Sequence, residues 1–114
     1  MINPGFYDLQ CPQGATFNKR FTLLLSDVPV NLTGYTARMQ VRESYDSASA
    51  VVSLTSGSGI ALGGTAGTID VTVSSTATAA LDAGQYVYDL ELDSGSSVDR
   101  WLQGSWIVSA EVTR

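Results

Sequence analysis

The stretch Tyr86-Val87-Tyr88-Asp89-Leu90-Glu91-Leu92-Asp93 decides the class of fold. Apolar and mostly acidic side chains alternate along it, and a period of two residues predicts a β-strand with one buried and one exposed face. Alternating or β-rich runs recur through the chain, at residues 16–25, 35–42, 50–55, 60–62, 67–73, 98–103 and 106–112. Clusters of Gly, Ser, Asn and Asp separate these runs. About seven to nine short strands with frequent turns predict an all-β fold, either an antiparallel β-sandwich or a small barrel.

One segment has a helical pattern instead. Residues 75–84 begin with Ser and Thr, which favour helix N-caps, continue with alanines and end at Gly84. We expect a single short helical turn that stops at this glycine.

The residues between this turn and the strand resemble a motif of immunoglobulin domains. In Asp82-Ala83-Gly84-Gln85-Tyr86-Val87-Tyr88, Tyr86 takes the position of the corner tyrosine, whose hydroxyl bonds to backbone upstream, here near residues 75–81. Tyr88 stands where antibody domains have their second cysteine, so a ring would replace the disulfide in the core. The resemblance implies an immunoglobulin-like antiparallel β-sandwich in which Asp82, Gly84, Tyr86 and Tyr88 are structural residues.

The length of 114 residues fits one domain with its own core. We expect an extended N-terminal arm at residues 1–14 and a single β-sandwich domain at residues 15–114. Phe6, Tyr7 and Leu9 make the arm too apolar for a free tail. It should therefore dock on an edge of its own domain or, as we favour, on a neighbouring subunit.

Charge and hydropathy narrow the classes of partner. The net charge of −5 opposes binding to a phosphate backbone, so no nucleic-acid partner is predicted. No apolar run approaches the roughly 20 residues that cross a bilayer, and the first residues lack the features of a secretory signal. We expect cytoplasmic synthesis and no membrane partner.

The sequence contains little that could perform chemistry. There is no histidine, and the single cysteine, Cys11, has no disulfide partner within the chain. Asp89, Glu91 and Asp93 should share the solvent face of one strand, where acids ordinarily serve solubility rather than catalysis. A calcium site at Asp93, Ser94 and Asp99 is less favoured than a solvated turn. We expect no enzyme activity, no cofactor and no metal.

Other charged and aromatic residues suggest contacts. Arg38 and Arg42 should face outward and pair across strands with Asp89 and Glu91. Trp106 alternates with apolar neighbours and is expected in the core. The candidate interface residues are Phe6, Tyr7, Leu9 and Trp101.

Four segments together resemble short structural proteins of tailed bacteriophages, including the N-terminal domain of baseplate upper proteins. They are Gln13-Gly14-Ala15-Thr16-Phe17, residues 32–42, residues 86–92 and residues 104–114. The resemblance implies a non-enzymatic virion protein, a connector in the tail, baseplate or fibre-attachment region, whose partners are other virion proteins and several copies of itself. The alternatives are a capsid decoration (cement) subunit and, from another class, a carbohydrate-binding module.

Overall fold

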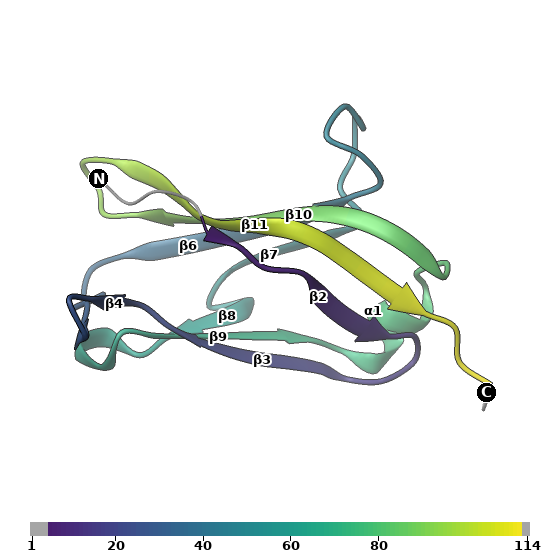
Figure 1. Cartoon of the computed structure of the whole chain (residues 1–114), viewed down its shortest axis with the longest axis horizontal. Helices are drawn as coiled ribbons and strands as arrows, with labels where there is room; N and C mark the ends of the chain where they lie inside the picture. Colours follow the sequence, from purple (N-terminus) through teal and green to yellow (C-terminus); the bar gives the residue numbers. More distant parts are fainter. Residues whose placement is uncertain (1–4, 113–114) are drawn as a thin grey trace.

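Two layers of β-strands face each other across the core in the computed structural model, which describes residues 5–112 (Figure 1). One layer contains β6 (Thr36–Arg42), β7 (Val52–Ser56), β10 (Gly84–Asp93) and β11 (Val98–Ser109). The other contains β3 (Phe17–Thr22), β8 (Gly59–Leu62) and β9 (Thr68–Val73). Pairing of β7 with β8 joins the layers into one curled sheet of nine strands. The predicted all-β sandwich is confirmed.

The sheet is mixed rather than purely antiparallel, which corrects one part of the prediction. The short N-terminal strands β1 (Gly5–Phe6) and β2 (Leu9–Pro12) run parallel to β11, and β7 runs parallel to β8. β8 and β9 form an antiparallel hairpin, with a 3₁₀ turn over Gly64–Ala66 between the strands. A separate two-stranded hairpin consists of β4 (Leu24–Leu25) and β5 (Val28–Pro29).

The strand order is that of an immunoglobulin-like sandwich. The neighbours β6, β10 and β11 correspond to the C, F and G strands of such domains, and β3, β9 and β8 correspond to B, E and D. The N-terminal strands depart from this pattern. Since β1 and β2 pair only with β11, no strand among residues 5–112 covers the outer edge of β3.

The core follows the predicted alternation. Along β10 the apolar side chains are buried, and from β6 Ala37, Met39 and Val41 meet them, while Tyr35 is half-buried. Trp106 is fully buried, as expected, and its ring centroid lies 4.6 Å from that of Phe17 on the opposite layer. Full burial of an aliphatic side chain contributes about 1.5–3 kcal/mol, so this apolar interior accounts for most of the driving force of folding.

The short helix α1 (Ser75–Ala79) precedes the corner before β10. The Ser74 hydroxyl caps it by accepting a hydrogen bond from the Ala77 amide at 3.2 Å. The helix ends at Ala79, with Ala80 as its C-cap, and not at Gly84, which is instead the first residue of β10, so the predicted stop is too late in the chain. Tyr86 is 7% exposed, and its hydroxyl donates to the Asp82 carbonyl at 2.8 Å, the geometry of a tyrosine corner.

The N-terminal segment belongs to its own domain. Leu9 and Cys11 on β2 are buried in the core, 2% and 0% exposed. The Asp8 carboxylate accepts a hydrogen bond from the Ser105 amide at 3.0 Å. The expectation of an arm placed on a neighbouring subunit is therefore wrong, because alternate side chains of β2 fill this domain's own core.

Candidate functional site

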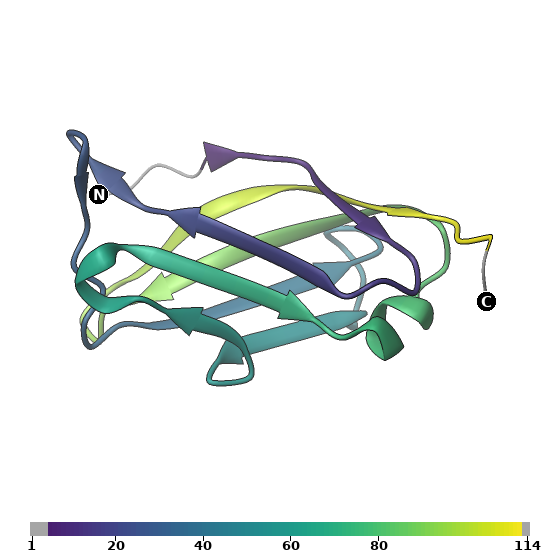
Figure 2. The same ribbon diagram turned by 90° about the horizontal axis from the view of Figure 1, so that it is seen from below.

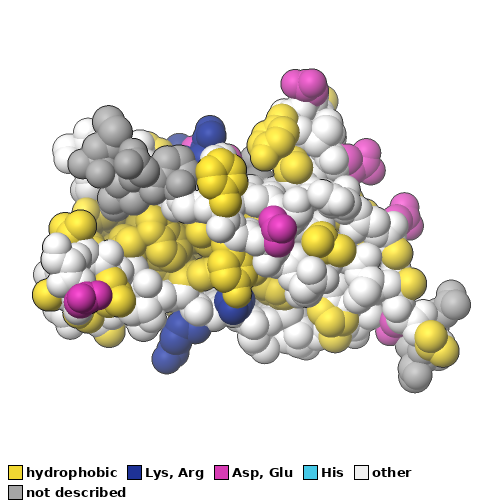
Figure 3. All heavy atoms as spheres, viewed as in Figure 1, with side chains coloured by type: hydrophobic (Ala, Val, Ile, Leu, Met, Phe, Trp, Pro, Cys, Tyr) yellow, Lys and Arg dark blue, Asp and Glu magenta, His cyan; other side chains and the backbone are white. Residues whose placement is uncertain are grey.

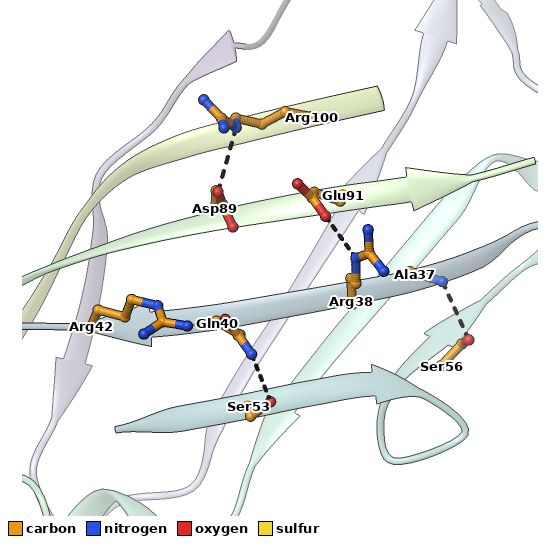
Figure 4. Close-up of polar contacts among 9 residues, drawn as sticks. All are labelled: Ala37, Arg38, Gln40, Arg42, Ser53, Ser56, Asp89, Glu91 and Arg100. Atoms are coloured by element: carbon orange, nitrogen blue, oxygen red, sulfur yellow. Dashed lines mark hydrogen bonds and ion pairs between the residues drawn. The ribbon is translucent and has the colours of Figure 1, made fainter. Parts of the chain in front are cut away.

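A charged groove with a volume of about 480 Å³ lies on the outer face of β6, β10 and β11. We use the name charged groove for the surface formed by Arg38, Arg42, Tyr45, Asp89, Glu91 and Arg100. Outward side chains of adjacent strands stand side by side here because they alternate with the core residues (Figure 4).

The pairing within the groove agrees only partly with the prediction. The Arg38 guanidinium lies 2.6 Å from Glu91, its register neighbour on β10. Asp89 pairs with Arg100 on β11 at 3.4 Å, not with Arg42. Arg42 lies opposite Val87, and its guanidinium donates instead to the Ser47 carbonyl at 2.9 Å and to the Gln40 side chain. These partners depend on which strands are neighbours, and the sequence alone does not give the order of the strands in the sheet.

Burial affects one carboxylate of the groove. It raises the pKa of Asp89, and the neighbouring Glu91 raises it further, while the Arg100 guanidinium acts against both. Tyr45 stands at the rim on the loop after β6 and is 70% exposed. The groove therefore offers alternating cations and anions beside one aromatic ring, an arrangement suited to binding polar groups.

A further ion pair lies outside the groove and was missed from the sequence. Arg20 on β3 and Asp70 on β9 are register neighbours, 2.6 Å apart. Alternation predicts that Asp70 faces outward, but the ion pair could be predicted only if the pairing of β3 with β9 were known.

The turn between β10 and β11 is held by its own hydrogen bonds. The Asp93 carboxylate accepts from the Gly95 amide at 2.8 Å, and the Ser94 hydroxyl accepts from the Ser97 amide at 3.2 Å. Across residues 5–112, no three His, Cys, Asp or Glu side chains gather as metal ligands would. The longest helix there has five residues, too few to cross a membrane.

A second surface is apolar. We call β4, β5 and the turn between them the apolar hairpin, where Leu24, Leu25 and Val28 are 50%, 72% and 62% exposed. The turn residues Ser26 and Asp27 both have left-handed backbone, with φ of 51° and 65°, which makes a tight two-residue turn. The hairpin lies at one end of the long axis, where Figure 3 shows hydrophobic side chains gathered.

The structure places some of the candidate interface residues on the surface and others in the core. Phe6 and Tyr7 are exposed, 79% and 44%. Leu9 is a core residue and is not available to a partner. Trp101 is the extra residue where the register of β11 shifts, because Leu90 pairs with Leu102 and Glu91 with Arg100. Its ring packs edge-on against Phe21, with centroids 5.7 Å apart, so it is not an exposed platform for sugars.

Fold and surfaces together define a small immunoglobulin-like β-sandwich with one charged and one apolar surface. No protein-family model and no curated protein sequence matches the chain. Among solved structures, one similar in fold comes from a study of parallel homodimers of the extracellular domains of the voltage-gated sodium channel beta4 subunit. It has 10% sequence identity and a TM-score of 0.46, over 98% of each chain.

Proposed function

We propose that this protein is a non-enzymatic structural protein of a bacteriophage virion, a connector in the tail, baseplate or fibre-attachment region. The observation that carries the proposal is the apolar hairpin. Leu24, Leu25 and Val28 are exposed on a two-stranded hairpin, and surface of this kind is typical of a site that another subunit covers. Each such side chain would contribute about 1.5–3 kcal/mol to association if fully covered, before the entropy cost of binding.

Two further features support the proposal. Four segments of the chain resemble short structural proteins of tailed bacteriophages. In the charged groove, Asp89 and Glu91 are each paired with an arginine, so they are arranged as a polar surface rather than as an acid and a base poised over a substrate.

The test is the protein content of purified phage particles produced from the genome that encodes the chain. Mass spectrometry should find the protein at a fixed copy number in particles, and a reconstruction should show the apolar hairpin against another subunit. Detection in the lysate but not in particles would contradict the proposal. A capsid decoration subunit, the alternative within this class, would appear on the head in the same reconstruction.

A matched pair of variants tests the hairpin itself. Leu25→Asp should block incorporation into particles without changing thermal unfolding, because Leu25 is 72% exposed. Tyr45→Asp changes a residue that is 70% exposed, away from the hairpin, and should be incorporated normally. Equal incorporation of both variants would remove the hairpin from the interface.

A carbohydrate-binding module is the second candidate function, and the exposed ring of Tyr45 beside the charged groove favours it. An aromatic face packs on the apolar side of a sugar ring, while arginines and carboxylates bond its hydroxyls. A glycan array would test this candidate. Binding that Tyr45→Ala abolishes would support it, and a blank array would exclude it.

A further inference from the structure

The outer edge of β3 is an unpaired strand edge within residues 5–112. β3 is the last strand of the sheet and pairs only with β9. In constant-type immunoglobulin sandwiches the first strand covers this edge, but here that part of the chain pairs with β11 instead.

The register identifies the free backbone groups. The Leu23 amide donates to the Gly67 carbonyl at 2.8 Å, and this pair continues the antiparallel register of β3 with β9. Backbone groups alternate in direction along an antiparallel strand, so the odd-numbered residues of β3 bond to β9. The amides and carbonyls of Asn18, Arg20 and Thr22 therefore face away from the sheet, and no hydrogen bond within residues 5–112 reaches them.

A groove runs beside this edge. It has a volume of about 320 Å³ and lies between β3 and β2, which follow the same side of the sandwich (Figure 2). Its lining includes Tyr7, Leu9, Phe17 and Lys19. Apolar side chains here flank one cation, Lys19, and one acid, Asp8, and a strand added to β3 would place alternate side chains among them.

Lys19 is the cation of this groove. Its ammonium group donates to the Tyr7 hydroxyl at 3.1 Å and lies 5.0 Å from the centre of that ring. Within residues 5–112 it forms no ion pair with an acid, whereas Arg20 next to it is paired with Asp70. The Asp8 carboxylate also lines the groove and accepts a hydrogen bond from the Ser105 amide, and no ion pair between it and Lys19 forms within residues 5–112. The Lys19 ammonium is therefore available to a carboxylate of a bound segment.

We propose that β3 accepts an extended acidic segment of a different protein chain, which adds antiparallel to its outer edge and places a carboxylate beside Lys19. Main-chain hydrogen bonds to Asn18, Arg20 and Thr22 would supply affinity, and the groove would select the side chains. A second copy of this chain is the less favoured occupant. Pairing β3 with β3 about Arg20 would set two arginines opposite each other, and like charges opposed across strands are unfavourable. This surface is separate from the apolar hairpin, and its test does not depend on the virion proposal.

The experiment uses amide resonances of the full-length protein and two synthetic peptides. The acidic probe is acetyl-Thr-Val-Thr-Glu-Thr-Val-Thr-amide, and the control probe has Lys in place of Glu. The acidic peptide should slow hydrogen exchange at the amides of Asn18, Arg20 and Thr22. It should bind about tenfold more tightly than the lysine peptide.

Charge reversal gives the sharpest readout. Lys19→Glu should invert the preference, binding the lysine peptide more tightly than the acidic one. Thr55→Glu, an exposed change on β7 in the other layer, is the control and should keep the wild-type preference. If Lys19→Glu does not fold, as judged by loss of the protected amides of β3, Lys19→Met should bind both peptides equally.

Three results would overturn the proposal. The first is no protection of these amides at millimolar acidic peptide. The second is equal binding of the two peptides by the wild-type protein. The third is protection that rises with protein concentration without any peptide, which would make a second copy the occupant.

Discussion

The hydroxyl of Tyr88, at the centre of the core, donates a hydrogen bond to the backbone carbonyl of Tyr7, 81 residues earlier in the chain. The Tyr7 amide in turn donates to the Gln103 carbonyl at 3.0 Å. The backbone between β1 and β2 is thus held by both β10 and β11. This contact makes the N-terminal segment a structural part of the sandwich rather than a free arm.

Tyr88→Phe should lower the free energy of unfolding by about 1–2 kcal/mol, because the Tyr7 carbonyl loses its buried donor. Urea denaturation would measure the change. Tyr45→Phe is the matched control, since Tyr45 is 70% exposed, and it should leave stability unchanged. Equal stability of Tyr88→Phe and the wild type would show that this hydrogen bond contributes nothing.

Alkaline pH should destabilise the protein through the same residue. Burial raises the pKa of Tyr88 well above its usual value near 10, so the folded state binds this proton more tightly than the unfolded state. The contribution of the protonated Tyr88 hydroxyl to the free energy of unfolding is complete below about pH 10 and is lost as pH rises toward the folded-state pKa. Urea midpoints from pH 8 to pH 11.5 should fall more steeply for the wild type than for Tyr88→Phe, and parallel curves would contradict this.

The tyrosine corner gives a second stability test. Tyr86→Phe removes the 2.8 Å hydrogen bond to the Asp82 carbonyl and should cost about 1 kcal/mol. Thermal and urea unfolding should agree on the loss. Gln85→Ala, an exposed change on the same strand, serves as control. If Tyr86→Phe and Gln85→Ala have the same free energy of unfolding, the hydrogen bond of the tyrosine corner contributes nothing to stability.

The N-terminal strand should be essential for stability in the isolated protein. Leu9→Ala should cost about 2–5 kcal/mol, the usual range for a buried leucine, and deletion of residues 1–12 should cost at least as much. Native Cys11 should resist thiol reagents, because it is buried and burial raises its pKa. If Cys11 of the native protein reacts as fast as it does in urea, β2 is dispensable. The same conclusion would follow if the truncated protein melts at an unchanged temperature.

Two aspartates should respond to acid in opposite directions. Burial raises the pKa of Asp89, so its favourable contribution is present at low pH and is lost as pH rises through the folded-state pKa. A hydrogen bond from Arg20 lowers the pKa of Asp70, so its contribution is present above about pH 4 and is lost as pH falls. From pH 3 to pH 7, Asp89→Asn should gain stability relative to the wild type, and Asp70→Asn should lose it. If the stabilities of Asp89→Asn and Asp70→Asn relative to the wild type change in the same direction with pH, the environments assigned to the two aspartates are wrong.

Several features could be read from the sequence because local chemistry determines them. Side chains alternate across a strand, so Tyr86, Tyr88 and Leu90 had to share a face, and that face had to be the buried one. The corner tyrosine was recognisable because its hydroxyl bonds only four residues upstream. The Arg38–Glu91 pair was anticipated because both residues face outward from strands with clear alternation.

What the sequence determined by itself is therefore the strand pattern, the all-β class and the corner before β10. The tertiary structure decided which strands are neighbours and in what register. The pairing of β10 with β11 brought Arg100 rather than Arg42 to Asp89, although Arg100 is the register neighbour of Glu91. Trp101, a candidate interface residue, lies at the register shift on β11 and packs against Phe21. The tertiary structure also placed Leu9 and Cys11 in the core and left the edge of β3 without a partner among residues 5–112. The physical reason is that strand pairing joins residues far apart in the chain, and local alternation is the same whichever neighbour a strand has.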